Sequence, residues 1–123
     1  MKEVGNVLRV LKEARRLISE DNPHDLKLLS NQTVHSATIS QDADNVIVAV
    51  LVYSIGKVME REHYREMEGW SEFYEAVKKN LDLAIKCLEK SELEKCRNYL
   101  GRIRNSLNKI DGRLSSYIKD IFK

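Results

Sequence analysis

The stretch that decides the fold class is Leu93–Ile121, which reads LEKCRNYLGRIRNSLNKIDGRLSSYIKDI. Its apolar residues recur at alternating steps of three and four and form an apolar seam: Leu93, Cys96, Leu100, Ile103, Leu107, Ile110, Leu114, Tyr117 and Ile121. A stripe that repeats every ~3.5 residues keeps one face of a long helix against a partner helix. The seam therefore predicts a long C-terminal heptad helix over residues 92–122. Its phase is kept across Gly112, which favours one continuous or slightly kinked helix.

The remainder of the chain also has helical periodicity. Residues 3–20 carry apolar positions at steps of three and four, and Asn22-Pro23 then predicts a break with Pro23 in the first turn of the next helix. Gly69 predicts another break, ahead of an amphipathic helix that begins near Trp70. Ser91 and Glu94 have the spacing of a capping box at the start of the long helix.

Eight consecutive apolar residues, Val46–Tyr53, leave strand and helix open by periodicity alone. The chain has no second run of this type to pair with it in a sheet, and the apolar pattern continues helically to Met59. We therefore expect a helix over residues 40–62, apolar on all sides and placed at the centre of the fold.

The composition supports a single all-α domain, residues 1–123, built as a bundle or array of four or five helices. The chain is 42% hydrophobic and 33% charged. It contains only one Pro and five Gly, so it has few residues that favour turns, and a few long helices are expected. It has no charged-then-apolar leader and no apolar run of ~18 residues, so we expect a cytoplasmic protein that does not cross a membrane. Cys87 and Cys96 fall on apolar stripes and are expected to be reduced and buried.

A polar stripe is the main candidate for a site. In a helical register its members, spaced by four, three, four and three residues, would share one face: Asn31, His35, Thr38, Asp42 and Asn45. Such a face could hold a small polar ligand, and Asp42 lies close enough in register to tune His35. The alternative is structural: these groups cap helices and form a buried polar layer. Both interpretations remain open.

Motifs for metal binding and catalysis are missing. The three His residues do not stand at the spacing of a zinc site, and the chain has no glycine-rich phosphate loop, Gly-x-Ser-x-Gly elbow or Cys-x-x-Cys. No nucleophile with an adjacent base can be named. We therefore expect no metal, no cofactor and no catalytic residue.

A basic stripe runs beside the apolar seam: Lys95, Arg102, Lys109 and Arg113. From Ser91 onward, eight Lys and Arg stand against four Asp and Glu, a net charge of +4. This stripe could follow the phosphate backbone of a nucleic acid. Alternatively it is a solvated face whose charges complement the acidic 60–75 segment.

The central region resembles small uncharacterised all-helical archaeal proteins. The likeness covers roughly residues 30–61 and rests on the run Asn31-Gln32-Thr33-Val34-His35-Ser36, then Ile39, Gln41-Asp42 and the apolar stretch Val46–Tyr53. It implies a helical array and brings no activity, cofactor or catalytic residue with it.

Together these observations favour a non-enzymatic interaction or scaffold module that forms a homodimer through helix 92–122. The apolar seam is longer than the shorter helices could cover, which is the reason for expecting self-association. Two alternatives are a small-ligand-binding or hydrolytic protein that uses the polar stripe, and a nucleic-acid-binding protein that uses the basic stripe.

Overall fold

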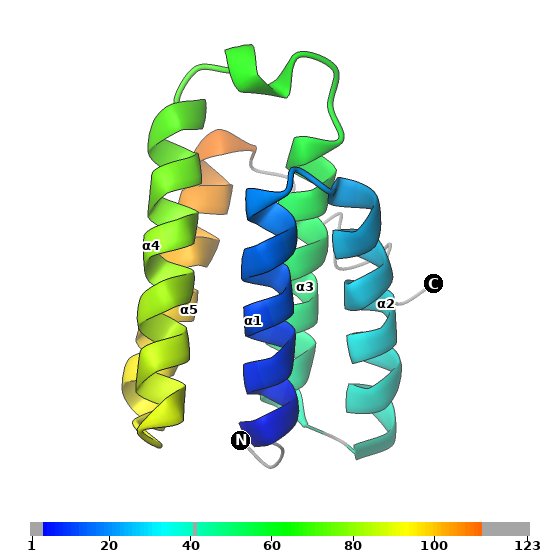
Figure 1. Cartoon of the computed structure of the whole chain (residues 1–123), viewed down its shortest axis with the longest axis vertical. Coiled ribbons are helices and arrows are strands. Elements are labelled where there is room, and N and C mark those ends of the chain that lie inside the picture. The colour runs from blue at the N-terminus through cyan, green and yellow to red at the C-terminus, as the bar shows by residue number, and fades with distance from the viewer. Residues whose placement is uncertain (1–3, 41, 112–123) are drawn as a thin grey trace.

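The computed structural model describes residues 4–40 and 42–111, with the backbone alone for residues 38–40. These residues form five α-helices: α1 (Val4–Ser19), α2 (Pro23–Ser40), α3 (Ala43–Met59), α4 (Trp70–Glu89) and α5 (Leu93–Ile110). A short 3-10 helix, η1 (Tyr64–Glu66), lies in the connection between α3 and α4 (Figure 1). The predicted all-α fold of four or five helices is confirmed.

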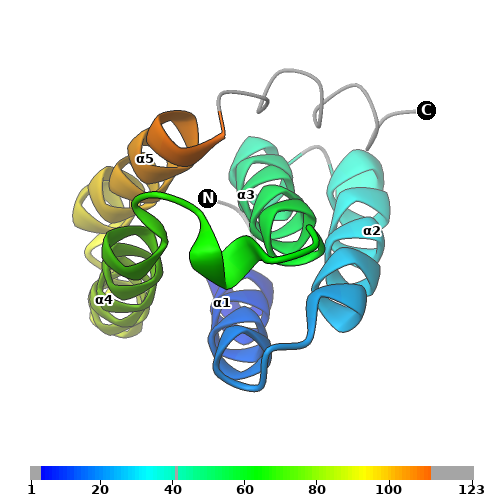
Figure 2. The ribbon, with the colours of Figure 1, turned by 90° about the horizontal axis from the view of Figure 1, so that it is seen from above.

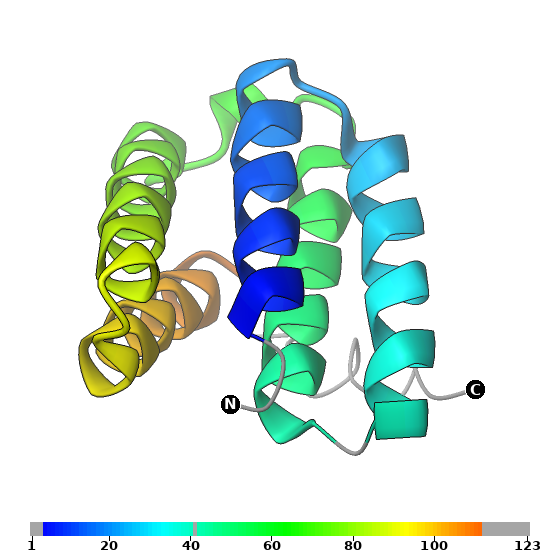
Figure 3. The same ribbon diagram turned by 60° about the horizontal axis from the view of Figure 1, so that its bottom comes forward.

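The helices are arranged as two antiparallel hairpins with α1 between them. α2 packs most extensively on α3, and α4 on α5, while α1 contacts α2, α3 and α4 (Figure 2). Figure 3 shows α5 inclined to α4, whereas α1, α2 and α3 run nearly side by side. Direct packing between α3 and α5 is slight. α3 and α5 therefore lie next to each other with little direct contact.

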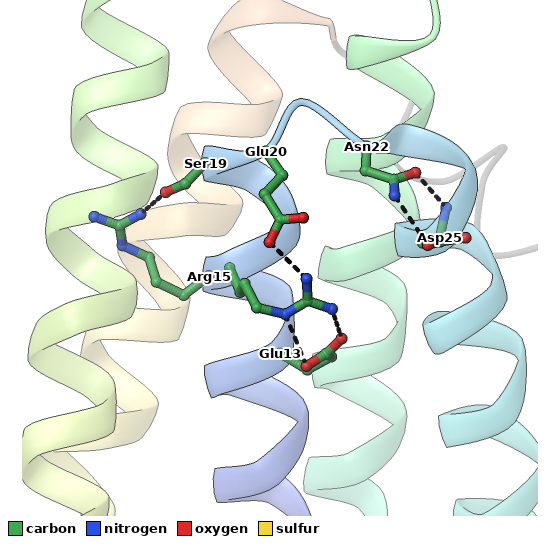
Figure 4. A network of polar contacts seen from close by, with 7 residues as sticks. Glu13, Arg15, Ser19, Glu20, Asn22 and Asp25 are labelled. Atoms are coloured by element: carbon green, nitrogen blue, oxygen red, sulfur yellow. Dashed lines mark hydrogen bonds and ion pairs between the residues drawn. The ribbon is translucent and has the colours of Figure 1, made fainter.

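Most helix starts follow from local signals in the sequence. Asn22 and Asp25 cap the start of α2 reciprocally: the Asp25 amide donates to Asn22 Oδ1 at 3.1 Å, and Asn22 Nδ2 donates to Asp25 Oδ2 at 2.9 Å (Figure 4). Pro23 is the first residue of α2, as predicted. Gly69 precedes α4 with φ of +79°, a left-handed conformation that glycine adopts without strain.

The predicted capping box at Ser91 is wrong. Ser91 lies in the left-handed region with φ of 59°, and the N-cap of α5 is the next residue, Glu92. The turn between α4 and α5 instead closes through backbone bonds, in which the Glu92 amide donates to the Cys87 carbonyl at 2.8 Å. Ser91 thus lies in the turn that reverses the chain, and it precedes the N-cap position by one residue.

The prediction of a long C-terminal heptad helix is not supported, because α5 ends at Ile110. At Asp111 the backbone leaves the helical region with φ of −131°. The Asp111 side chain is 3% exposed and forms an ion pair with Arg61, just beyond the end of α3. This contact fixes the end of α5 against α3. The seam residues Leu114, Tyr117 and Ile121, like Arg113, lie outside the described residues.

The core is centred on α3, as the all-round apolar run predicted. Val48, Val52, Ile55 and Val58 of α3 are almost fully buried, and Asp42 and Glu60 flank the helix as its caps. None of the helices in the described ranges combines the length and the apolar character needed to span a membrane.

Candidate functional site

The structure divides the polar stripe between two helices. Asn31 and His35 lie exposed on α2, whereas Asp42 and Asn45 are buried at the start of α3. The side chain of Thr38 lies outside the described residues. The expectation that these residues share one helical face is wrong, because they lie on two separate helices: α2 ends at Ser40 and α3 begins at Ala43.

Asp42 and Asn45 belong to a buried polar network that joins α1 to α3. Asp42 is the N-cap of α3: its Oδ1 accepts from the Asp44 amide at 3.1 Å, and its Oδ2 accepts from Asn45 Nδ2 at 3.1 Å. Asn45 Oδ1 in turn accepts from Asn6 Nδ2 at 3.3 Å. Among the described residues no buried side-chain N or O atom lacks a hydrogen-bond partner. This geometry matches the structural interpretation of the polar stripe.

The apolar seam is already covered within the chain. Leu100, Ile103 and Leu107 are at most 4% exposed and belong to the same core as α1, α3 and α4, as does Cys96. Leu93 and Ile110, near the two ends of α5, are partly buried against this core. A second copy could reach these side chains only by opening the core, although self-association itself stays a prediction.

A surface groove of about 600 Å³ lies between α3 and α5 and is called the α3–α5 groove below. Its apolar lining comes from Val46, Ile47, Val50 and Leu51 of α3 and from Leu100 of α5. Ile47 is 50% exposed, whereas most large apolar residues of α3 are buried. A half-exposed isoleucine in a concave apolar surface marks a binding site better than scattered surface apolar residues do.

Cationic side chains line the α5 side of this groove, and we call Arg97, Arg102 and Arg104 the arginine rim. Arg97 makes a bidentate ion pair with Asp44, with Nε–Oδ1 and Nη2–Oδ2 distances both 3.1 Å. This contact holds the pKa of the Asp44 carboxyl below its ordinary value. The Arg102 guanidinium stacks over the Tyr99 ring at 5.0 Å, and Arg104 is exposed.

Ion pairs close both ends of the space between α3 and α5. Arg97–Asp44 joins the beginnings of the two helices, and Arg61–Asp111 joins their ends. The two helices therefore run in the same direction. Between these tethers their contact is slight, which leaves the α3–α5 groove open.

The basic stripe lies on the exposed surface of α5. Lys95, Arg102 and Lys109 are all exposed, and Lys95 forms an ion pair with Glu92 at 2.7 Å. Arg102 is the one member of the basic stripe that also lines the α3–α5 groove within the described residues. Sequence reasoning missed Arg97, Arg104 and the exposed side of α3. The sequence did contain one signal for this side of α3: the run Val46–Tyr53 is apolar on every face of the helix, including the face that the other helices do not cover.

The side chains that could bind a metal are not grouped together among the described residues. Within them no group of three His, Cys, Asp or Glu side chains is placed to hold a metal ion. Cys96 is fully buried, and burial raises the pKa of its thiol to about 11, so it is not a thiolate nucleophile at neutral pH. Cys87 is half-buried, and neither cysteine is in a disulfide.

Comparison with known proteins identifies no relative of this chain. No family model, no curated protein and no solved structure matches it. The resemblance to archaeal helical proteins thus stays a prediction.

Proposed function

We propose that this protein is a non-enzymatic interaction module that binds an amphipathic helix of a partner protein in the α3–α5 groove. The observation that carries the proposal is Ile47, which is half-exposed in a concave apolar lining on α3, a helix whose large apolar residues are mostly buried. Grooves of this kind accept the apolar face of a helix, which places anchors at intervals of three and four residues.

The arginine rim defines the chemistry of the partner. Arg102 and Arg104 stand beside the apolar lining, while Arg97 is already bound to Asp44 and Glu94. A helix that combines an apolar face with flanking Asp or Glu would bury apolar area and pair with these guanidinium groups. We infer an acidic amphipathic helix as the ligand.

The other functional hypotheses have weaker support. The polar stripe is split between two helices, and its buried members are engaged in the network with Asn6. In the basic stripe, Lys95 is paired with Glu92. Nucleic-acid binding through Lys95, Arg102, Lys109 and Arg113 stays a prediction, as does homodimer formation.

The test uses two fluorescein-labelled helical peptides of about 18 residues, long enough for about five turns. Both carry Leu at heptad positions a and d, with Glu on the remaining face of one and Lys on the other. Fluorescence anisotropy should show binding of the Glu peptide and at least tenfold weaker binding of the Lys peptide, because only the first complements the arginine rim.

A matched pair of variants assigns the binding to the groove. Ile47→Asn removes the central apolar contact. Leu28→Asn alters the other large apolar residue that is exposed within the described ranges, which lies on α2 and is 47% exposed. Ile47→Asn should weaken the Glu peptide at least tenfold, since burying such a side chain contributes about 1.5–3 kcal/mol. Leu28→Asn should leave it unchanged. Equal effects of the two variants, or no binding of the Glu peptide, would contradict the proposal.

A further inference from the structure

A cavity separate from the α3–α5 groove lies at the end of the bundle where α1 and α3 end and α4 begins (Figure 1). It has a volume of about 220 Å³ and shares no lining residue with the groove. Its lining includes Ile18 and Met59, which are almost fully buried, and three aromatic residues: Tyr64 of η1 and Trp70 and Tyr74 of α4. We call it the aromatic cavity.

The three rings belong to one cluster with Trp70 at its centre. The ring centroids of Tyr64 and Trp70 lie 4.8 Å apart with an interplanar angle of 75°. Those of Trp70 and Tyr74 lie 5.5 Å apart with an angle of 36°. Because the face of an aromatic ring carries negative charge density, several rings around one cavity attract a cation.

Two cations of the chain itself already lie against rings of this cluster. Arg65 Cζ is 5.4 Å from the centroid of the Tyr64 ring, and Lys78 Nζ is 4.1 Å from the centroid of the Tyr74 ring. Both distances fall within the ~6 Å over which a ring attracts a cation. The rings of the aromatic cavity therefore bind positive charge within the folded chain.

Asp21 adds a carboxylate to the lining of the aromatic cavity. It accepts a hydrogen bond from the Tyr64 hydroxyl and forms an ion pair with the Arg65 guanidinium. Arg65 Nε also donates to Tyr64 Oη at 3.1 Å. The Arg65 side chain is 67% exposed, and ion pairs of this exposed kind are weak. A ligand cation can therefore replace the guanidinium beside Asp21.

We propose that the aromatic cavity binds a quaternary ammonium group, which replaces Arg65 beside Asp21 and packs against Tyr64, Trp70 and Tyr74. Such a group has no N–H to satisfy, which suits a lining made mostly of aromatic and apolar side chains, and aromatic residues recognise it by cation–π attraction. The cavity is smaller than the roughly 300–1,000 Å³ of sites for drug-sized ligands, so it fits a single small head group. This site is independent of the proposed function.

The single tryptophan of the chain, Trp70, reports on this site directly. Choline chloride and Nε-trimethyllysine carry the same head group, and each should change the Trp70 fluorescence of the full chain in a saturable way. The stronger of the two identifies the source of the group, a choline compound or a methylated protein side chain. 3,3-Dimethylbutan-1-ol has the shape of choline without its charge and should bind about fivefold more weakly, since it lacks the cation–π attraction.

Charge variants locate the cation in the aromatic cavity. Asp21→Asn removes the carboxylate and keeps a residue type that tolerates the left-handed φ of 56° at this position, so choline should bind about threefold more weakly. Arg65→Ala removes the competing guanidinium, so choline should bind about threefold more tightly. Glu94→Gln is the matched control: it alters an exposed carboxylate paired with Arg97 near the start of α5, at the other end of the bundle, and should leave choline binding unchanged.

Three results would overturn the inference. The first is no saturable response to either quaternary ammonium compound in the parent chain and in Arg65→Ala. The second is equal affinity for choline and 3,3-dimethylbutan-1-ol, which would make the cavity an apolar site without preference for charge. The third is an effect of Asp21→Asn no larger than that of Glu94→Gln, or an Arg65→Ala chain that binds choline no more tightly than the parent, since either would place the cation elsewhere.

Discussion

At the scale of single residues, Asp42 shows how a polar group in an apolar region is used for architecture. Its carboxylate accepts from the Asp44 amide and from Asn45, and the Asp42 backbone carbonyl accepts from the Val46 amide at 3.3 Å. These bonds satisfy donors at the start of α3, where the helix itself supplies no acceptors. His35, placed on the same sequence stripe, is instead exposed on α2.

This contrast predicts different stability effects for two members of the polar stripe. Asp42→Ala removes the N-cap and leaves Asn45 without an acceptor, so we expect the free energy of unfolding to fall by about 1–3 kcal/mol. His35→Ala should change it by less than about 0.5 kcal/mol, because the side chain is exposed. Urea unfolding followed by circular dichroism measures both. A larger loss for His35→Ala than for Asp42→Ala would mean that the polar stripe acts as one unit after all.

At the scale of helices, the sequence predicts the elements whose boundaries are set locally. Pro23 and Gly69 act within one or two residues of a helix start, and the apolar run of α3 excludes a strand because no partner run exists. These features depend on neighbours in the chain, so periodicity and turn chemistry were sufficient.

The features that sequence reasoning missed depend on distant contacts. The C-cap residue of α5, Asp111, pairs with Arg61, which lies 50 residues earlier in the chain, whereas the heptad phase of the sequence continues through Gly112. The polar stripe was assigned to one face because Asp42, the N-cap of α3, is the one local signal we identify for the boundary between α2 and α3. The α3–α5 groove likewise exists through the relative placement of two helices, which a one-dimensional pattern does not contain.

Close packing of α2 on α3 makes Gly56 a second test at this scale. A Cβ at Gly56 would lie 3.1 Å from Lys27 Cγ and 3.2 Å from the Pro23 carbonyl oxygen. Because that oxygen is backbone at the start of α2, Gly56→Ala should reduce the free energy of unfolding by about 1–3 kcal/mol despite the better helix propensity of alanine. Gly5→Ala is the control, since no described atom lies within 4 Å of its Cβ. Thermal and urea unfolding should show a neutral or slightly stabilising change there; a stable Gly56→Ala protein would mean that α2 can shift.

At the scale of the whole molecule, the two hairpins explain why the chain has both a complete core and an open groove. α1 fills the space between the hairpins on one side and closes the core with α3, α4 and α5. On the other side the ion pairs Arg97–Asp44 and Arg61–Asp111 join α3 to α5, and direct packing between the two helices is slight. The apolar surface left between these tethers is the α3–α5 groove, in which we propose that a partner helix binds.

The expected oligomeric state depends on whether the apolar residues of α5 are exposed to a second copy or buried within one chain. The homodimer predicted from the sequence relied on the apolar seam, but Leu100, Ile103 and Leu107 are buried in one chain. With these residues buried, the described part of α5 offers a second copy no exposed apolar seam. We therefore expect light scattering coupled to size exclusion to give a mass near 14.3 kDa at tens of micromolar. A mass of twice that value would contradict this expectation. Reversal of the dimer by Ile47→Asn and not by Leu28→Asn would then identify the groove as the interface between copies.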